Sequence, residues 1–162
     1  HPPPIYKNNG AEEIDMVINV SMVKDGCWED VARDISAVRE ATRGHILKVI
    51  IECCLLTEEE KIKLCHIVSD CGADFIKTST GKGYPGATFE AAYTMCKAIK
   101  TYHSITGNKV GIKISGGVRT AEDAVRYYTI VKEILGNEWL NKDLFRIGAS
   151  SLVGDIEKRL GK

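Results

Sequence analysis

The chain has 162 residues, of which 44% are hydrophobic and 27% are charged, a composition that suits one globular domain. Its 22 Lys and Arg residues balance 22 Asp and Glu residues, so net charge indicates neither a nucleic acid nor a membrane surface as partner. The six cysteines include no Cys-x-x-Cys pair and do not cluster with the four histidines. No apolar run approaches the roughly 20 residues of a membrane span, and the start His1-Pro2-Pro3-Pro4 resembles no targeting peptide. We therefore expect reduced thiols, no metal site and a cytoplasmic protein.

Strand-like runs alternate with helix-like runs along the chain. The predicted strands cover residues 14–20, 46–54, 74–80, 110–115 and 144–150. Between them, Thr57 precedes Glu60 in a capping-box pattern, Thr88 and Thr120 open helical runs, and Gly136 gives a stop signal. This alternation is typical of repeated βα units around a parallel sheet, so the predicted class is α/β.

Two architectures fit five βα units: an open five-stranded sheet, or the C-terminal part of a barrel whose first units are absent. A closed eight-stranded barrel usually takes about 250 residues. In the first predicted strand, Ile14, Met16 and Ile18 share one face, while Asp15 and Asn19 share the other. Helices cover both faces of an open α/β sheet, whereas the second face of a barrel strand points to the lumen. Polar residues on that face favour the barrel.

Two lysines occupy strand-like segments directly before loops: Lys77 in ADFIKTSTG and Lys113 in GIKISGGVRT. A lone buried ammonium is costly unless another group pairs with it or uses it. Strand alternation places Asp15, Lys77 and Lys113 on the inner face of three different strands, near the ends where barrel enzymes have their sites. The three side chains are therefore a candidate site.

The chemistry of an amine on a carbonyl explains such a cluster. Lysine attacks a carbonyl only when neutral, and its ordinary pKa is about 10.4. Burial and a neighbouring cation both favour the neutral form, so we expect Lys113 to activate Lys77. Asp15 could hold Lys113 charged and pass protons through water. The simpler alternatives are a snorkelling Lys77 and a plain ion pair between Asp15 and a lysine.

Two further loops are suited to an anion. SGGVRT (115–120) contains Gly116 and Gly117, whose backbone N–H groups can approach a phosphate, and GASS (148–151) leads into the last helix. Phosphate sites in barrels commonly follow the last two strands, and these are the last two predicted strands here. A glycine pair alone is also common in ordinary turns.

Five segments in this order resemble the deoxyribose-phosphate aldolase family. They are GAEEIDMVIN, LKVIIE, GADFIKTSTG, VGIKISGGVRTAEDA and FRIGASS. The resemblance runs from about Gly10 to Leu160 and implies a TIM (β/α)8 barrel, of which the single domain 1–162 holds the five C-terminal βα units. It implies a class I aldolase that reversibly cleaves 2-deoxy-D-ribose 5-phosphate to acetaldehyde and D-glyceraldehyde 3-phosphate, with no metal or organic cofactor.

The resemblance also implies roles for individual residues. Lys77 would form the Schiff base, Lys113 would tune its pKa, and Asp15 would serve with Lys113 in proton transfer. Thr80 would lie near the sugar hydroxyls. The implied phosphate contacts are Lys82, Gly116, Gly117, Gly148, Ser150 and Ser151.

The chain departs from the family pattern at its N-terminal end. Relatives begin with about three further βα units, which residues 1–9 cannot supply, so we expect a portion of a longer barrel. Exposed sheet edges would then invite pairing with another chain, and a homo-oligomer is the expected assembly. Two alternatives stay open: an inactive or partner-dependent half-barrel that retains a phosphate site, and another Schiff-base aldolase or transaldolase acting on a sugar phosphate.

Overall fold

A computed structural model describes residues 10–161; residues 1–9 and 162, which the predicted domain also includes, lie outside the described part. Five strands form one sheet in the order β1-β2-β3-β4-β5, and every neighbouring pair is parallel. The strands are β1 (Glu13–Val17), β2 (Ile46–Ile50), β3 (Phe75–Lys77), β4 (Gly111–Ser115) and β5 (Phe145–Gly148). The predicted α/β class and the five predicted strands are confirmed.

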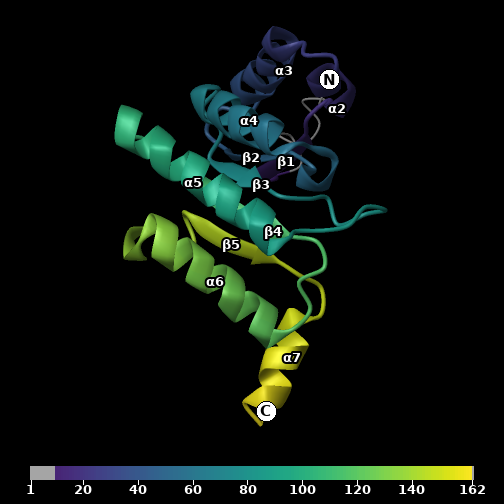
Figure 1. Ribbon diagram of the computed structural model, residues 1–162, viewed down its shortest axis with the longest axis vertical. Coiled ribbons are helices and arrows are strands. Elements are labelled where there is room, and N and C mark those ends of the chain that lie inside the picture. The colour runs from purple at the N-terminus through teal and green to yellow at the C-terminus, as the bar shows by residue number, and fades with distance from the viewer. Residues whose placement is uncertain (1–9, 162) are drawn as a thin grey trace.

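Helices fill the connections between the strands. They are α2 (Val20–Lys24), α3 (Trp28–Ala41), α4 (Glu58–Asp70), α5 (Phe89–Thr106), α6 (Ala121–Leu135) and α7 (Leu152–Arg159), with short 3-10 turns η1 (Cys53–Leu55) and η2 (Asn137–Trp139). Figure 1 shows α3 to α6 following one another along the sheet in the order of the strands, while α7 extends away at the C-terminal end. Within residues 10–161, no helix is both long and apolar enough to cross a membrane.

The predicted helix boundaries have their expected caps. Thr57 and Glu60 form a reciprocal capping box at the start of α4. The side chains of Thr88 and Thr120 accept hydrogen bonds from the first turns of α5 and α6. Gly136 ends α6 with a φ of 84°, a conformation that glycine adopts without steric cost. These four local signals are confirmed.

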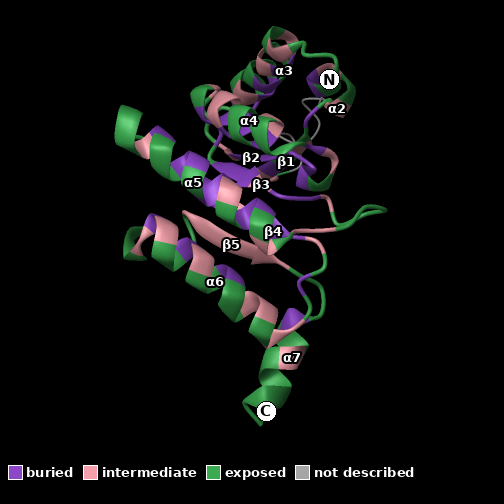
Figure 2. Cartoon of the chain, in the orientation of Figure 1, coloured by how far each residue is buried: buried purple, intermediate pink, exposed green. Residues whose placement is uncertain are grey.

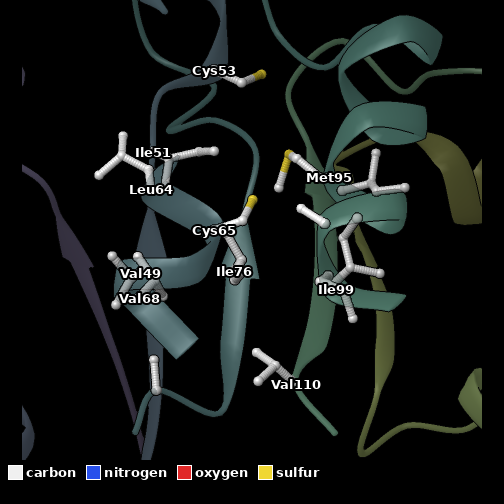
Figure 3. Packing of buried hydrophobic residues seen from close by; sticks show 14 of the residues in the cluster. Val49, Ile51, Cys53, Leu64, Cys65, Val68, Ile76, Met95, Ile99 and Val110 are labelled. Carbon is white, nitrogen blue, oxygen red and sulfur yellow. The ribbon is translucent and has the colours of Figure 1, made fainter. Parts of the chain in front are cut away.

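The helices cover one face of the sheet. Ile76, Ile112 and Ile114 are fully buried on this face and belong to one continuous apolar cluster with the inner sides of the helices. Figure 3 shows Leu64 of α4 and Ile99 of α5 within this cluster. Burial is highest in the central strands and falls toward β5 and α7 (Figure 2). The opposite face therefore carries the polar side chains, as strand alternation predicts.

Four predicted strands extend too far, the fifth of the chain only slightly, since its predicted end is residue 150 and it ends at Gly148. The first ends at Val17 rather than at residue 20, because the Asn19 side chain accepts from the Met22 backbone N–H and starts α2. The second ends at Ile50, because the chain turns at Glu52 into the 3-10 helix η1. The third covers only residues 75–77 of the predicted 74–80. Sequence pattern alone does not reveal where a buried strand leaves its sheet.

The sheet is curved so that its two outer strands approach each other. Within residues 10–161, β1 and β5 each have one neighbouring strand. Four strand spacings of about 4.8 Å would separate them by about 19 Å in a flat sheet. Arg146 of β5 nevertheless donates hydrogen bonds to Glu13 of β1 across the polar face. The five strands thus form a segment of a barrel wall rather than a flat open sheet.

Substitution of Thr57 by alanine should lower the free energy of unfolding by about 1 kcal/mol, because the first turn of α4 loses its side-chain cap. Urea unfolding followed by circular dichroism measures this loss. Thr57→Ser keeps the hydroxyl and should retain most of the stability. Equal stability of the serine and alanine variants would contradict a contribution from the cap.

Candidate active site

Asp15 joins two lysines on the inner face of the sheet. Lys77 Nζ donates to Asp15 Oδ2 at 2.8 Å, and Lys48 Nζ donates to Asp15 Oδ1 at 2.8 Å. The parallel register sets Asp15 opposite Lys48 and sets Lys77 opposite Lys113. Lys48 is only 4% exposed, so its ammonium depends on this carboxylate and its neighbours for solvation.

A second carboxylate completes the network beside Asp15. Lys48 Nζ also lies 2.7 Å from Glu13 Oε2. Arg146 Nη1 donates to both oxygens of Glu13, at 2.7 and 2.5 Å. The Arg146 guanidinium lies 4.8 Å from the centre of the Phe75 ring, an arrangement that favours a cation. Side chains from four strands are thereby linked.

The network carries more positive than negative charge. Its cations are Lys48, Lys77, Lys113 and Arg146, and its carboxylates are Glu13 and Asp15. Such an excess on a concave polar face attracts anions and raises their local concentration. The site is therefore electrostatically suited to an anionic ligand.

The fold perturbs the protonation of Lys113. Burial lowers its pKa first, and the positive charge of Lys77 lowers it further, while the nearby carboxylate of Asp15 opposes part of the shift. A lysine with a lowered pKa gives up a proton more readily near neutral pH than an exposed one. The charge of Lys77 thus acts on Lys113 across the β3–β4 pair, where the two residues are register partners.

Both carboxylates are held ionised. Burial of Asp15 opposes its ionisation, but the hydrogen bonds from Lys48 and Lys77 outweigh burial and lower its pKa. Hydrogen bonds from Arg146 and Lys48 lower the pKa of Glu13 from 4.5 to about 2. Asp15 is therefore an ionised carboxylate in direct contact with Lys77.

A cavity of about 350 Å³ opens where β3, β4 and β5 end. Seven of the predicted site residues line it: Lys77, Thr80, Lys113, Gly116, Gly117, Gly148 and Ser150. Barrel enzymes place their sites at this end of the strands. A larger hollow of about 790 Å³ lies by the start of β2, where Arg39 and Asp74 pair with each other. That hollow lies at the N-terminal ends of the strands, whereas Lys77 and Lys113 line the cavity at the C-terminal ends.

Glycines allow close contacts in the walls of the cavity. A Cβ on Gly86 would lie 2.0 Å from the backbone oxygen of Gly116, and Gly116 has a φ of +85°. A Cβ on Gly148 would lie 3.1 Å from Lys113 Cε. Close backbone approach and a positive φ thus require glycine at position 116, and the limited space beside Lys113 favours glycine at position 148, whatever ligand the loops bind.

Three predicted site residues do not line the cavity. Lys82 and Ser151 are exposed and lie outside the cavity lining. Asp15 also lies outside the lining, although it contacts Lys77. Asp15 was expected to pair with Lys113. Among the ion pairs of residues 10–161 it pairs instead with Lys77 and with Lys48, which is its register partner on the neighbouring strand.

The sequence pattern gave no role to four polar residues of this region: Glu13, Lys48, Glu52 and Arg146. Strand alternation could have found three of them, because Glu13 and Asp15 share a face, Lys48 is the register partner of Asp15, and Arg146 is that of Lys113. Glu52 follows β2 and gives no periodic signal. In the part of the chain that the structure describes, no His, Cys, Asp and Glu side chains gather as a metal-binding group.

The parallel sheet is curved, helices cover one of its faces, and lysines lie at the strand ends on the other face. This is the architecture of a TIM-barrel enzyme. Comparison with known families agrees with this class. The chain belongs to the DeoC/LacD family of aldolases, whose family model matches residues 5–151.

Individual relatives support this membership. Deoxyribose-phosphate aldolase of Mus musculus is 46% identical over 155 residues, which are 94% of this chain and 48% of that protein. The crystal structure of a protein described as a putative deoxyribose-phosphate aldolase from Coccidioides immitis matches with a TM-score of 0.81 and 37% sequence identity. The match covers 97% of this chain and 56% of that chain. The tetrameric deoxyribose phosphate aldolase of Aeropyrum pernix, at 24% identity, shares the fold with a TM-score of 0.71, over 96% of this chain and 57% of that chain. The chain spans about half the length of the curated relatives that it matches.

Acid should destabilise the fold partly through Glu13. Its pKa is lowered from 4.5 to about 2, so the ionised carboxylate adds stability above pH 4.5, and this stability is lost as the pH falls toward 2. Urea unfolding of Glu13→Gln between pH 2 and 6 should show a flatter decline than the unchanged chain shows.

The matched control is Glu12→Gln, which alters the exposed neighbouring carboxylate. This variant should keep the acid dependence of the unchanged chain. If Glu13→Gln kept it as well, the ion pairs of Glu13 would contribute nothing to stability.

Proposed function

We propose that the protein containing this chain is an aldolase that reversibly cleaves 2-deoxy-D-ribose 5-phosphate to acetaldehyde and D-glyceraldehyde 3-phosphate through a Schiff base on Lys77. The observation that carries the proposal is the position of Lys77, which contacts the ionised Asp15, faces Lys113 and lines a cavity with surplus positive charge. The choice of substrate is supported by the mouse relative, which is named deoxyribose-phosphate aldolase.

The proposed reaction begins with the Lys77 amine. Lys113 is proposed to activate Lys77; once Lys77 has lost its proton to water, its neutral amine adds to the C1 carbonyl of the open-chain sugar. Loss of water gives the protonated imine. Removal of the proton from the C3 hydroxyl then breaks the C2–C3 bond, which releases D-glyceraldehyde 3-phosphate and leaves an enamine. Protonation at C2 and hydrolysis release acetaldehyde and restore Lys77.

Lys113 is proposed to move protons during these steps. Its lowered pKa suits it to exchange protons near neutral pH, and it lies beside Lys77 in the register. Asp15, which accepts from Lys77 and Lys48, is proposed to exchange protons with Lys113 through water. General acid–base groups of this kind typically contribute a factor of about 10²–10⁴ to rate.

The phosphate is proposed to bind at the far end of the cavity from Asp15. Gly116, Gly117, Gly148 and Ser150 line the cavity, and the backbone N–H groups of the glycines and the hydroxyl of Ser150 are the proposed donors. Lys82 and Ser151 are proposed to reach the phosphate from the rim. Thr80 is proposed to bind a sugar hydroxyl. The net positive charge of the inner face supports all of these assignments.

The domain and assembly are proposed from the fold and its relatives. We infer that the five βα units are the C-terminal units of a complete TIM barrel and that the protein forms a homo-oligomer. The one-sided pairing of β1 and β5 within the described residues also favours an alternative, a half-barrel that needs a partner's strands for activity. The proposed role is the breakdown of deoxyribonucleotide sugars in the cytoplasm.

Borohydride trapping with acetaldehyde tests the nucleophile. The unchanged chain should gain one ethyl group in a fast phase measured by intact mass, because borohydride reduces the imine. Lys77→Met should lose the fast phase. Lys113→Met should slow it by at least about tenfold at pH 7, because a proton-transfer group is removed.

Lys100→Met is the matched control, since Lys100 is an exposed helical lysine far along α5 from the cavity lining. This variant should react like the unchanged chain. A full fast phase in Lys77→Met would show that another amine reacts. A folded unchanged chain without a fast phase would favour the half-barrel alternative.

A further inference from the structure

Glu52 lies in an unusual place between β2 and η1. Its side chain is buried, at 4% exposure, although it carries a carboxylate. Among residues 10–161 it is the single non-glycine residue with a positive φ, at 40°. A left-handed backbone at such a residue is strained and persists only where the surroundings hold it. Strain of this kind often accompanies a functional role, so the contacts of Glu52 are informative.

Both carboxylate oxygens of Glu52 are used by one residue of another loop. The backbone N–H of Thr80 donates to Oε1 at 3.1 Å, and the Thr80 hydroxyl donates to Oε2 at 2.7 Å. Next to this contact, the Cys53 N–H donates to the Thr78 carbonyl at 2.8 Å. The left-handed turn thus brings the end of β2 against the loop that follows the Lys77 strand and attaches that loop at two points.

This contact fixes the hydrogen-bonding role of Thr80. A threonine hydroxyl has one hydrogen to donate and two lone pairs that accept. Glu52 takes the hydrogen, and the backbone N–H of Lys82 donates to the same oxygen at 3.3 Å. Thr80 lines the cavity together with Lys77 and Lys113. Its hydroxyl oxygen therefore has one lone pair left for a ligand and no hydrogen, so it accepts and does not donate.

We propose that Glu52 is a positioning residue, which holds Thr80 over the cavity as a hydrogen-bond acceptor for a hydroxyl group of the substrate. The inference rests on the proposed function, because it requires that a hydroxyl-bearing sugar phosphate occupies the cavity. It goes beyond that function by making Glu52 a determinant of specificity. An aldehyde without a hydroxyl, such as acetaldehyde, does not use this acceptor and should be nearly indifferent to it.

The ratio of two trapping rates tests this role. Glu52→Gln keeps the length of the side chain, but its amide has one acceptor oxygen in place of two, so it cannot accept from both the hydroxyl and the backbone N–H of Thr80. Borohydride trapping of the Lys77 imine by 2-deoxy-D-ribose 5-phosphate should fall by about tenfold or more, the effect of losing one oriented hydrogen bond. Trapping by acetaldehyde should fall by much less. A purely structural role for Glu52 would lower both rates together.

Variants of Thr80 test the same role without altering Glu52. Thr80→Val removes the acceptor and should lower sugar-phosphate trapping as Glu52→Gln does. The double variant should be no worse than either single variant, because the two residues act as one unit. Thr80→Ser restores the hydroxyl and should recover most of the rate lost in Thr80→Val. Glu59→Gln, which changes an exposed carboxylate at the start of α4, controls for loss of negative charge.

The outcomes separate this inference from the proposed function. If the unchanged chain is trapped by neither aldehyde, the proposed function fails, and the role of Glu52 fails with it. If the unchanged chain is trapped by both, an equal fall of both rates in Glu52→Gln, or a fall in neither, overturns the role of Glu52 alone. Should Glu52→Gln not fold, as judged by circular dichroism, the comparison of Thr80→Val with Thr80→Ser decides: equal rates overturn the proposed role.

Discussion

Asp15 shares its two carboxylate oxygens between Lys48 and Lys77, and the charged inner face of the sheet depends on this arrangement. Asp15 is itself exposed, so the cost of breaking these pairs falls mainly on Lys48, whose charge would lose a partner. Lys48 is nearly fully buried, and Glu13 is its second carboxylate partner. The pair of Glu13 with Arg146 then joins the first and last strands. The ion pairs of the inner face therefore depend on the curvature of the sheet, which brings β1 and β5 within reach of each other.

The loops at the carboxyl ends of the strands are held by polar contacts of a different kind. Thr78 and Ser115 exchange hydrogen bonds between side chain and backbone, at 3.0 Å in both directions. Gly86 and Gly116 bring two loops into direct backbone contact. Glu52 attaches the Thr80 loop to the end of β2. The cavity wall is built from loops that support one another, so Lys77 and Lys113 face a defined space.

Much of this arrangement could be predicted from the sequence. Strand alternation alone placed Asp15, Lys77 and Lys113 on one face, since side-chain direction has a period of two. Their partners could not be assigned with the same ease, because an ion pair depends on register and on sheet curvature. Asp15 was expected beside Lys113, but its register partner is Lys48. The left-handed conformation of Glu52 depends on tertiary contacts, and no local pattern marks it.

The central claim is that the amine of Lys77, rather than that of Lys48 or Lys113, reacts with the carbonyl of the sugar phosphate. All three amines belong to one charged network, so only the position of the adduct distinguishes them. Peptide mapping by mass spectrometry after borohydride reduction with 2-deoxy-D-ribose 5-phosphate measures that position directly. We predict that the modified peptide contains Lys77 and that Lys48 and Lys113 are unmodified. An adduct on Lys113 or Lys48 would contradict the assignment of the nucleophile.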